Sequence, residues 1–229
     1  ENGVSFAYDM DDNDVGYGLG ESNRGINKRG YVYESNCSDQ PNHTEDKISL
    51  YGAHNFIVIS GKQTFGLFVD YPGKLKFDIG YTLSSQIKIT CEDADLYLYV
   101  IEGETPYDFV KQFRKFIGRS YIPPKFSFGF WQSLCVYTTA DDFRKAADGY
   151  RENNIPIDMV YMDFDYMEDY KDFTVNQENF PDFEAYVNEM KEKGIHLVPI
   201  IDAGVKVEAG YDVYEEGVEK NYFCKREVG

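Results

Sequence analysis

The pair Pro123-Pro124 divides this chain into two parts whose hydrophobic patterns have different periods. Proline fixes φ and lacks a backbone N–H, so two in succession neither continue a helix nor fit inside a central strand. Before the pair, short β-branched and aromatic runs alternate with turn residues, and after it strand-like and helix-like segments alternate. The sequence therefore predicts two domains, residues 1–119 and residues 120–229.

The first part has the pattern of an all-β domain. Its runs of Val, Ile, Phe, Tyr and Thr are separated by Gly, Pro, Asn or Asp, and Tyr71-Pro-Gly-Lys74 is typical turn chemistry. Seven closely spaced strands predict an antiparallel β-sandwich. They are expected at Val4–Tyr8, Tyr31–Tyr33, Asn55–Ser60, Gln63–Asp70, Leu75–Ile79, Gln86–Cys91 and Asp95–Ile101.

A connecting helix is expected at the end of the first part. Pro106–Ile117 has apolar residues near one helical face, namely Tyr107, Val110, Phe113 and Ile117.

The second part alternates strand and helix. Both helices have apolar residues at i, i+3, i+4 and i+7, and Thr139-x-x-Asp142 resembles a capping box. The expected order is strand Phe126–Gln132, helix Thr139–Asn153, strand Met159–Phe164, helix Pro181–Lys193 and strand His196–Asp202. The apolar run in the last strand predicts burial on both faces. Repeating βα units are typical of a parallel (β/α)8 barrel, which takes roughly 250 residues, so we expect only the first part of one, about three units.

Charge and composition exclude several classes of function. The chain has 23 Lys and Arg against 40 Asp and Glu, a net charge of -17, which would repel a phosphate backbone and argues against nucleic-acid binding. We expect no membrane span and no signal peptide, since no apolar run approaches ~18–20 residues. Four scattered cysteines without a Cys-x-x-Cys pair predict free thiols and a cytoplasmic protein. The histidines lack metal-ligand spacing, so neither a metal nor a cofactor is expected.

Two aspartates stand where parallel α/β folds place their sites, at the carboxyl ends of strands. Asp163 and Asp202 each end an apolar strand, which makes them candidates for inward-facing carboxylates. A buried carboxylate is costly unless it binds something or accepts hydrogen bonds. The alternative is that they cap the next helix or pair with a cation, the candidates being Lys171, Arg144 and Lys206.

Several blocks, in order along the chain, resemble glycoside hydrolase family 31, the α-glucosidase family. They are Tyr17–Glu21, Ile117–Pro124, Asp158–Met167, Lys171–Thr174, Phe180–Asp182, Lys193–Asp202 and Gly210–Gly217. The likeness is nearest to the single-chain α-glucosidases of gut bacteria and covers their N-terminal portion only.

The resemblance implies retaining hydrolysis of terminal α-linked glucose from oligosaccharides such as maltose or isomaltose. Retaining enzymes use two carboxyl groups about 5–5.5 Å apart. In the family the nucleophile lies in a Trp-x-Asp-Met-Asn-Glu-like motif, which these 229 residues lack. We therefore expect no catalytic residue within this chain and no activity from it alone. A homo-oligomer is compatible with the resemblance.

Substrate-binding residues do carry over. Asp163 matches the aspartate that accepts hydrogen bonds from the glucose in the -1 subsite, and Ile200 and Asp202 match the wall and surroundings of that pocket. Asp39 matches a sandwich-loop residue that reaches over the barrel mouth, although a plain turn aspartate would fit the same pattern.

One segment departs from the family pattern. Cys135 occupies the position of an aromatic residue that lines the -1 glucose, so the stacking surface is lost unless Trp131 replaces it. Trp131 is otherwise expected in the core. A different function also stays open, namely a non-catalytic carbohydrate-binding β-sandwich with a barrel remnant, which would bind maltose without turnover.

Overall fold

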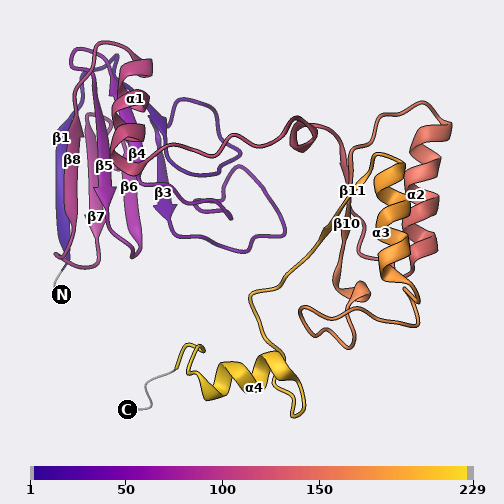
Figure 1. Ribbon diagram of the computed structural model, residues 1–229. Coiled ribbons are helices and arrows are strands. Elements are labelled where there is room, and N and C mark those ends of the chain that lie inside the picture. The colour runs from indigo at the N-terminus through magenta and orange to yellow at the C-terminus, as the bar shows by residue number, and fades with distance from the viewer. Residues whose placement is uncertain (1–2, 226–229) are drawn as a thin grey trace. The chain divides into compact units, whose positions relative to one another are not determined.

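The computed structural model describes residues 3–225 and contains two compact units, Glu1–Tyr121 and Ile122–Gly229 (Figure 1). Each unit has its own hydrophobic core. Between residues 3 and 225 no helix is both long enough and apolar enough to cross a membrane.

The first unit is a sandwich of two four-stranded sheets in which every strand pair is antiparallel, which confirms the predicted fold. One sheet has the order β1-β7-β6-β3 and the other β2-β4-β5-β8. The strands are β1 (Val4–Asp9), β2 (Val15–Gly18), β3 (Tyr31–Ser35), β4 (Phe56–Ser60), β5 (Phe65–Asp70), β6 (Leu75–Ile79), β7 (Gln86–Cys91) and β8 (Tyr97–Ile101).

Strand β2 was not among the predicted strands, because its glycines weaken the strand pattern. Those glycines let it approach β4 closely: a Cβ on Gly18 would lie 2.5 Å from the carbonyl oxygen of Phe56. Gly18 also has φ 127°, a conformation that other residues rarely adopt.

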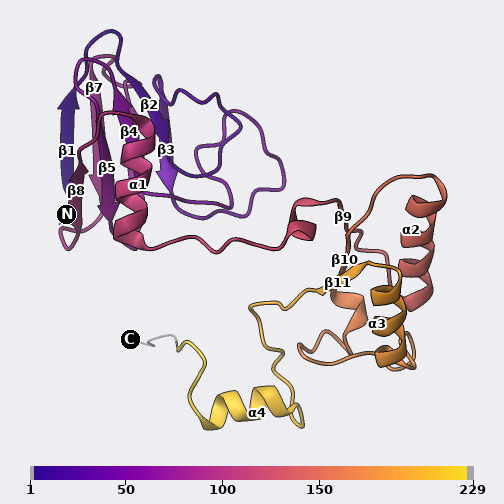
Figure 2. The ribbon, with the colours of Figure 1, turned by 45° about the horizontal axis from the view of Figure 1, so that its top comes forward.

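Strand β4 serves two cores because its alternate residues face opposite sides. Ile57 and Ile59 are buried between the two sheets. Phe56 and Val58 pack against α1 (Pro106–Ile117), which lies along the outer face of the second sheet (Figure 2). The bounds of α1 match the prediction, since Thr105 forms a capping box with Asp108 at its start.

The predicted apolar face of α1 contained four residues, and for three of them the prediction is wrong. Tyr107, Val110 and Ile117 are 73%, 46% and 53% exposed, whereas Phe113 is buried together with Phe109. Phe109 and Phe113 are one helical turn apart, and Phe113 stacks on Phe56 of β4 with ring centroids 4.2 Å apart. Contact with the aromatic rings of the sheet thus selects this face over the other apolar positions.

The second unit contains a parallel sheet of three described strands in the order β11-β10-β9, with α2 and α3 on one side of it (Figure 2). The predicted architecture, a β-sandwich followed by the first part of a parallel barrel, is therefore confirmed. The elements are η1 (Lys125–Phe128), β9 (Trp131–Gln132), α2 (Ala140–Glu152), β10 (Met159–Met162), η2 (Phe164–Tyr166), α3 (Phe183–Glu192), β11 (His196–Pro199) and α4 (Asp212–Glu219).

The core of this unit lies between the sheet and its two helices. Val160 and Met162 of β10 pack with the buried side chains Phe143, Tyr186 and Met190 of the helices. The capping box of α2 is present as predicted, with Thr139 and Asp142 bonded reciprocally.

Two predicted strands of this unit are shorter than expected. In the segment Phe126–Gln132 a 3-10 turn precedes the strand, and only Trp131–Gln132 pairs with β10. Strand β11 ends at Pro199, and Ile201 beyond it is 59% exposed. The expected burial of this segment on both faces is wrong, because β11 is an edge among the described strands and α3 covers one side only.

Candidate functional site

The carboxyl end of β10 presents Asp163 on the sheet face opposite the helices. Its backbone is still extended, with φ -79° and ψ -177°, so the alternation of the strand continues through it. Asp163 therefore shares a face with Tyr161, while Val160 and Met162 face the helices. Trp131 of β9 lies on this same face, with its ring 5.3 Å from that of Tyr161. This face of the sheet thus has two aromatic rings along β9 and β10 and a carboxylate at the end of β10.

The hydrogen bonding of Asp163 leaves part of its carboxylate available. Oδ1 accepts a hydrogen bond of 2.9 Å from the backbone N–H of Phe164 and so caps η2. The side chain is half-buried, and no described residue forms an ion pair with it. Oδ2 accepts no hydrogen bond from residues 3–225. The carboxylate is therefore oriented by the backbone while one oxygen remains free to accept.

The three candidate cations for the strand-end aspartates have other partners. Lys171 pairs with Glu168 and Glu208, and Lys206 with Glu208. Arg144 binds acidic side chains of α2 and α3, Asp141 and Glu189. Of the alternatives for Asp163, local capping is present and pairing with these three cations is not.

Asp202 differs from Asp163 in its surroundings. It is exposed, and its Oδ1 accepts a hydrogen bond of 3.1 Å from Ala203 N, so it is not the inward-facing carboxylate we expected. Its backbone N–H donates to Oδ1 of Asp172 at 3.0 Å. Asp172 is 2% exposed and is the buried carboxylate of this region. Its burial was not predicted, because it lies in a strongly acidic stretch without apolar periodicity.

Two segments meet around Asp172: the β10 loop (residues 163–175) and the β11 loop (residues 200–211). Tyr166 Oη donates to the carbonyl oxygen of Ile200 at 2.8 Å, and Tyr211 Oη donates to that of Asp172 at 2.7 Å. Burial and the nearby charge of Asp172 raise the pKa of both tyrosines, so their hydroxyl groups stay protonated as donors.

Charged groups add two more ties between these loops. Lys171 pairs with Glu208 at 3.4 Å, and Lys206 Nζ donates to the carbonyl oxygen of Asp169 at 3.0 Å. Hydrogen bonds from Lys206 and Lys171 lower the pKa of Glu208, which keeps its carboxylate charged. The β10 and β11 loops are thus joined by both hydrogen bonds and an ion pair.

The β10 loop contains three non-glycine residues in the left-handed region. Asp169, Tyr170 and Phe173 have φ of 48°, 60° and 64°. The side chains of Tyr170 and Phe173 are 65% and 66% exposed, so neither is held in place by burial.

The remaining predicted residues of this unit lie near the same strand ends. Ile200 follows β11, and its N–H donates to the carbonyl oxygen of Met162 at 2.9 Å, directly before Asp163. Cys135 is exposed in the turn after β9, and the flanking Leu134 is 44% exposed. Trp131 is 37% exposed, so it is not a core residue of this structure.

Asp39 lies in the first unit, in the long segment between β3 and β4 (residues 36–55). It is exposed and accepts a hydrogen bond from Tyr51 Oη, which raises the pKa of that tyrosine. Arg24 fixes the base of the segment through hydrogen bonds to the carbonyl oxygens of Val32, Glu45 and Asp46. Asp39 is therefore positioned by its own segment. In residues 3–225, no three His, Cys, Asp or Glu side chains form a group that could hold a metal ion.

Comparison with known families agrees with this architecture. The glycosyl hydrolases family 31 TIM-barrel domain matches residues 120–229, and the glycosyl hydrolase 31 N-terminal galactose mutarotase-like domain matches residues 1–78. Only residues 79–119 lie outside these two matches. The chain belongs to glycoside hydrolase family 31.

The chain is also similar to individual proteins in sequence and in fold. Alpha-glucosidase 2 of Bacillus thermoamyloliquefaciens is 34% identical over 97% of this chain and 30% of its own length. An alpha-xylosidase of Emericella nidulans is 26% identical over 92% of this chain and 26% of its own length. The dextranase of Flavobacterium johnsoniae, a D412A mutant complexed with isomaltotriose, has the same fold, with a TM-score of 0.86 at 23% identity over 96% of this chain and 27% of the dextranase chain. The chain thus spans less than a third of these relatives.

Proposed function

We propose that this chain forms the substrate-binding part of a retaining α-glucosidase that releases terminal glucose from oligosaccharides such as maltose or isomaltose. The observation that carries the proposal is Asp163, whose carboxylate is oriented by the Phe164 N–H and keeps one oxygen free at the end of a parallel strand. The 34% identity to an alpha-glucosidase over nearly the whole chain supports the choice of substrate class.

In this proposal Asp163 accepts hydrogen bonds from hydroxyl groups of the terminal glucose. Charge-assisted hydrogen bonds are roughly twice as strong as neutral ones, and an acceptor that is already oriented loses little on binding. Trp131 and Tyr161 supply an apolar surface on the same face for the C–H groups of the sugar ring. Ile200 contributes to the wall of the site, and Cys135 leaves more space than an aromatic residue would.

We assign neither Asp163 nor Asp202 as nucleophile. In the family the nucleophile lies in a Trp-x-Asp-Met-Asn-Glu-like motif, and neither aspartate stands in such a motif. Retaining hydrolysis needs two such groups about 5–5.5 Å apart. The proposal therefore assigns substrate binding, and not bond cleavage, to residues 1–229.

The test is the substitution Asp163→Asn in a longer parent protein that contains this chain and hydrolyses α-glucosides. The amide keeps the shape of the side chain but removes the negative charge, and we expect a loss of about 2–4 kcal/mol in kcat/KM on maltose and isomaltose. Asp141→Asn, on the exposed start of α2, is the matched control and should leave kcat/KM unchanged. A value for Asp163→Asn within threefold of the parent would refute the assignment. Maltose binding without turnover in that parent would instead favour a non-catalytic sugar-binding protein.

A further inference from the structure

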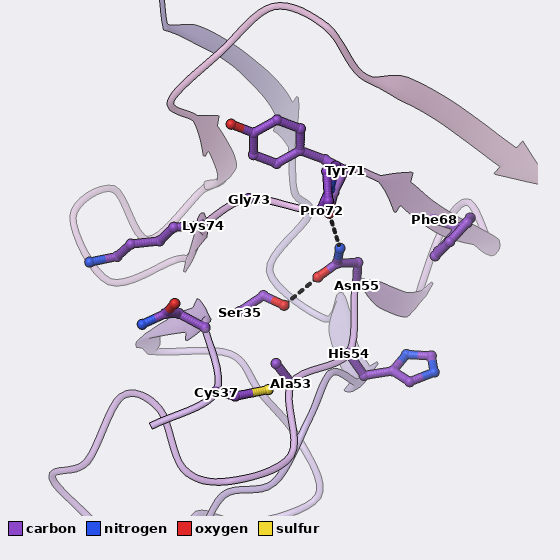
Figure 3. A pocket seen from close by; sticks show the side chains of 11 residues that line it. Ser35, Cys37, Ala53, His54, Asn55, Phe68, Tyr71, Pro72, Gly73 and Lys74 are labelled. Atoms are coloured by element: carbon purple, nitrogen blue, oxygen red, sulfur yellow. Dashed lines mark hydrogen bonds between the residues drawn. The ribbon is translucent and has the colours of Figure 1, made fainter. Parts of the chain in front are cut away.

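The first unit contains a pocket of about 500 Å³ that the proposed function does not use (Figure 3). Its lining comes from the end of β3 with the residues after it, the residues before β4, Phe68 of β5, and the turn between β5 and β6. The volume lies within the range of roughly 300–1,000 Å³ that is typical of small-molecule sites. All lining residues fall between Ser35 and Lys74, so the pocket belongs to this unit alone.

The amide of Asn55 occupies the middle of the pocket in a fixed orientation. Ser35 Oγ donates to Oδ1 of Asn55, and Nδ2 of Asn55 donates to the carbonyl oxygen of Tyr71 at 3.1 Å (Figure 3). An amide nitrogen carries two hydrogens and a carbonyl oxygen two lone pairs, so one donor and one acceptor remain for a ligand. The site therefore has a polar group that is already oriented before binding.

The lining also contains aromatic rings, and its one charged side chain is paired. Tyr71 lies over the turn at Gly73, where a Cβ would come within 2.6 Å of the tyrosine ring. Phe68 provides a second ring in the lining. Lys74 is the only charged residue that lines the pocket, and Glu34 pairs with it at 2.9 Å. The pocket thus has no net charge to select an ion.

From these features we infer that the pocket between Ser35, Asn55 and Tyr71 binds a neutral pyranose sugar. Hydroxyl groups of a sugar both donate and accept, as the free positions of the Asn55 amide do, and its C–H faces suit aromatic rings. A phosphorylated ligand is disfavoured, because Lys74 is already paired and the chain carries a net charge of -17. A cationic ligand would find no free carboxylate in this lining.

Cys37 gives a direct readout because its thiol is exposed and lines the pocket. Cys135 and Cys224 are also exposed, so the experiment uses the 229-residue chain with Cys135→Ser and Cys224→Ser. Cys91 has no exposed surface and should not react. The rate of maleimide addition to Cys37 is followed by intact mass, with and without maltose.

We expect saturating maltose to slow the labelling of Cys37 at least about fivefold, with half of the effect at millimolar concentration, the weak end of specific binding. Asn55→Ala should abolish the protection. Ser35→Ala, which frees the amide to rotate, should weaken it and decides the matter if Asn55→Ala does not fold. Asn42→Ala, on the exposed part of the same segment, is the matched control and should keep full protection.

Other outcomes would overturn the inference. One is an unchanged labelling rate up to about 50 mM maltose, which is well above the millimolar range of weak specific binding. The others are equal protection by the acyclic polyol sorbitol and full protection in a folded Asn55→Ala variant. Asp163→Asn separates this site from the proposed function. If that variant loses the protection, maltose acts from the end of β10 and the pocket is not its site. If it keeps the protection, the pocket stands whatever the kinetics of Asp163→Asn in the parent.

Discussion

Removing the carboxylate of Asp172 should weaken the attachment of the β11 loop to the β10 loop at Asp202. Asp172 is 2% exposed, and its Oδ1 accepts a hydrogen bond of 3.0 Å from the backbone N–H of Asp202. Hydrogen bonds to charged groups contribute about 1.5–3 kcal/mol, so Asp172→Ala should lower the local opening free energy by that amount. Each 1.4 kcal/mol is a factor of ten, which corresponds to amide exchange at Asp202 that is roughly ten- to a hundredfold faster.

Hydrogen–deuterium exchange, read at the single amide of Asp202, measures this change. Asp172→Asn retains an acceptor oxygen at the same place, so its effect should be smaller than that of Asp172→Ala. Glu178→Ala removes an exposed carboxylate from the segment that follows the β10 loop and should leave the exchange rate unchanged. If Asp172→Ala leaves exchange at Asp202 within threefold of the parent, the carboxylate does not hold the β11 loop and the reasoning fails.

Three further results are expected. The 229-residue chain should release no nitrophenol from a nitrophenyl α-glucoside, since loss of essential catalytic groups typically costs orders of magnitude, and turnover of a few per second in pure protein would contradict this. In a longer parent, Cys135→Trp should restore an aromatic wall and raise kcat/KM on maltose, by an amount equivalent to about 1 kcal/mol of transition-state stabilisation. An unchanged or lower kcat/KM would show that the ring does not reach the sugar. The hydrogen bonds from Thr139 lower the pKa of Asp142, so its stabilising effect is present above its unfolded pKa near 3.9 and is lost as the pH falls through the lower folded value. Urea midpoints between about pH 5 and about pH 2 should show a loss that is smaller in Asp142→Asn, and equal losses would argue against the cap.

The regular elements were largely predictable because local patterns specify them. Strands β6 and β7 have the predicted bounds, since their burial alternates along the strand. The bounds of α1 also match, because the capping box at Thr105 and the glycine at Gly118 mark its ends. Which face of α1 is buried was not predictable in the same way, because that depends on the aromatic surface of the sheet beneath it.

The site was only partly predictable. The position of Asp163 at a strand end follows from the apolar run before it, and the structure places it there. Whether it binds sugar remains a prediction. The burial of Asp172 depends on Asp202 and Tyr211, which are 30 and 39 positions away in the sequence. No local pattern encodes contacts between two loops at such separations.

The three left-handed residues of the β10 loop place its backbone under tension. A left-handed conformation costs a non-glycine residue about 1–2 kcal/mol, so Asp169, Tyr170 and Phe173 together would favour relaxation of the loop. The bonds from Lys206 and Tyr211 oppose that relaxation from the β11 side. The β10 loop, which begins at Asp163, therefore holds backbone strain that the β11 loop balances. A substitution in the β11 loop can shift the Asp163 carboxylate through the backbone without contacting it.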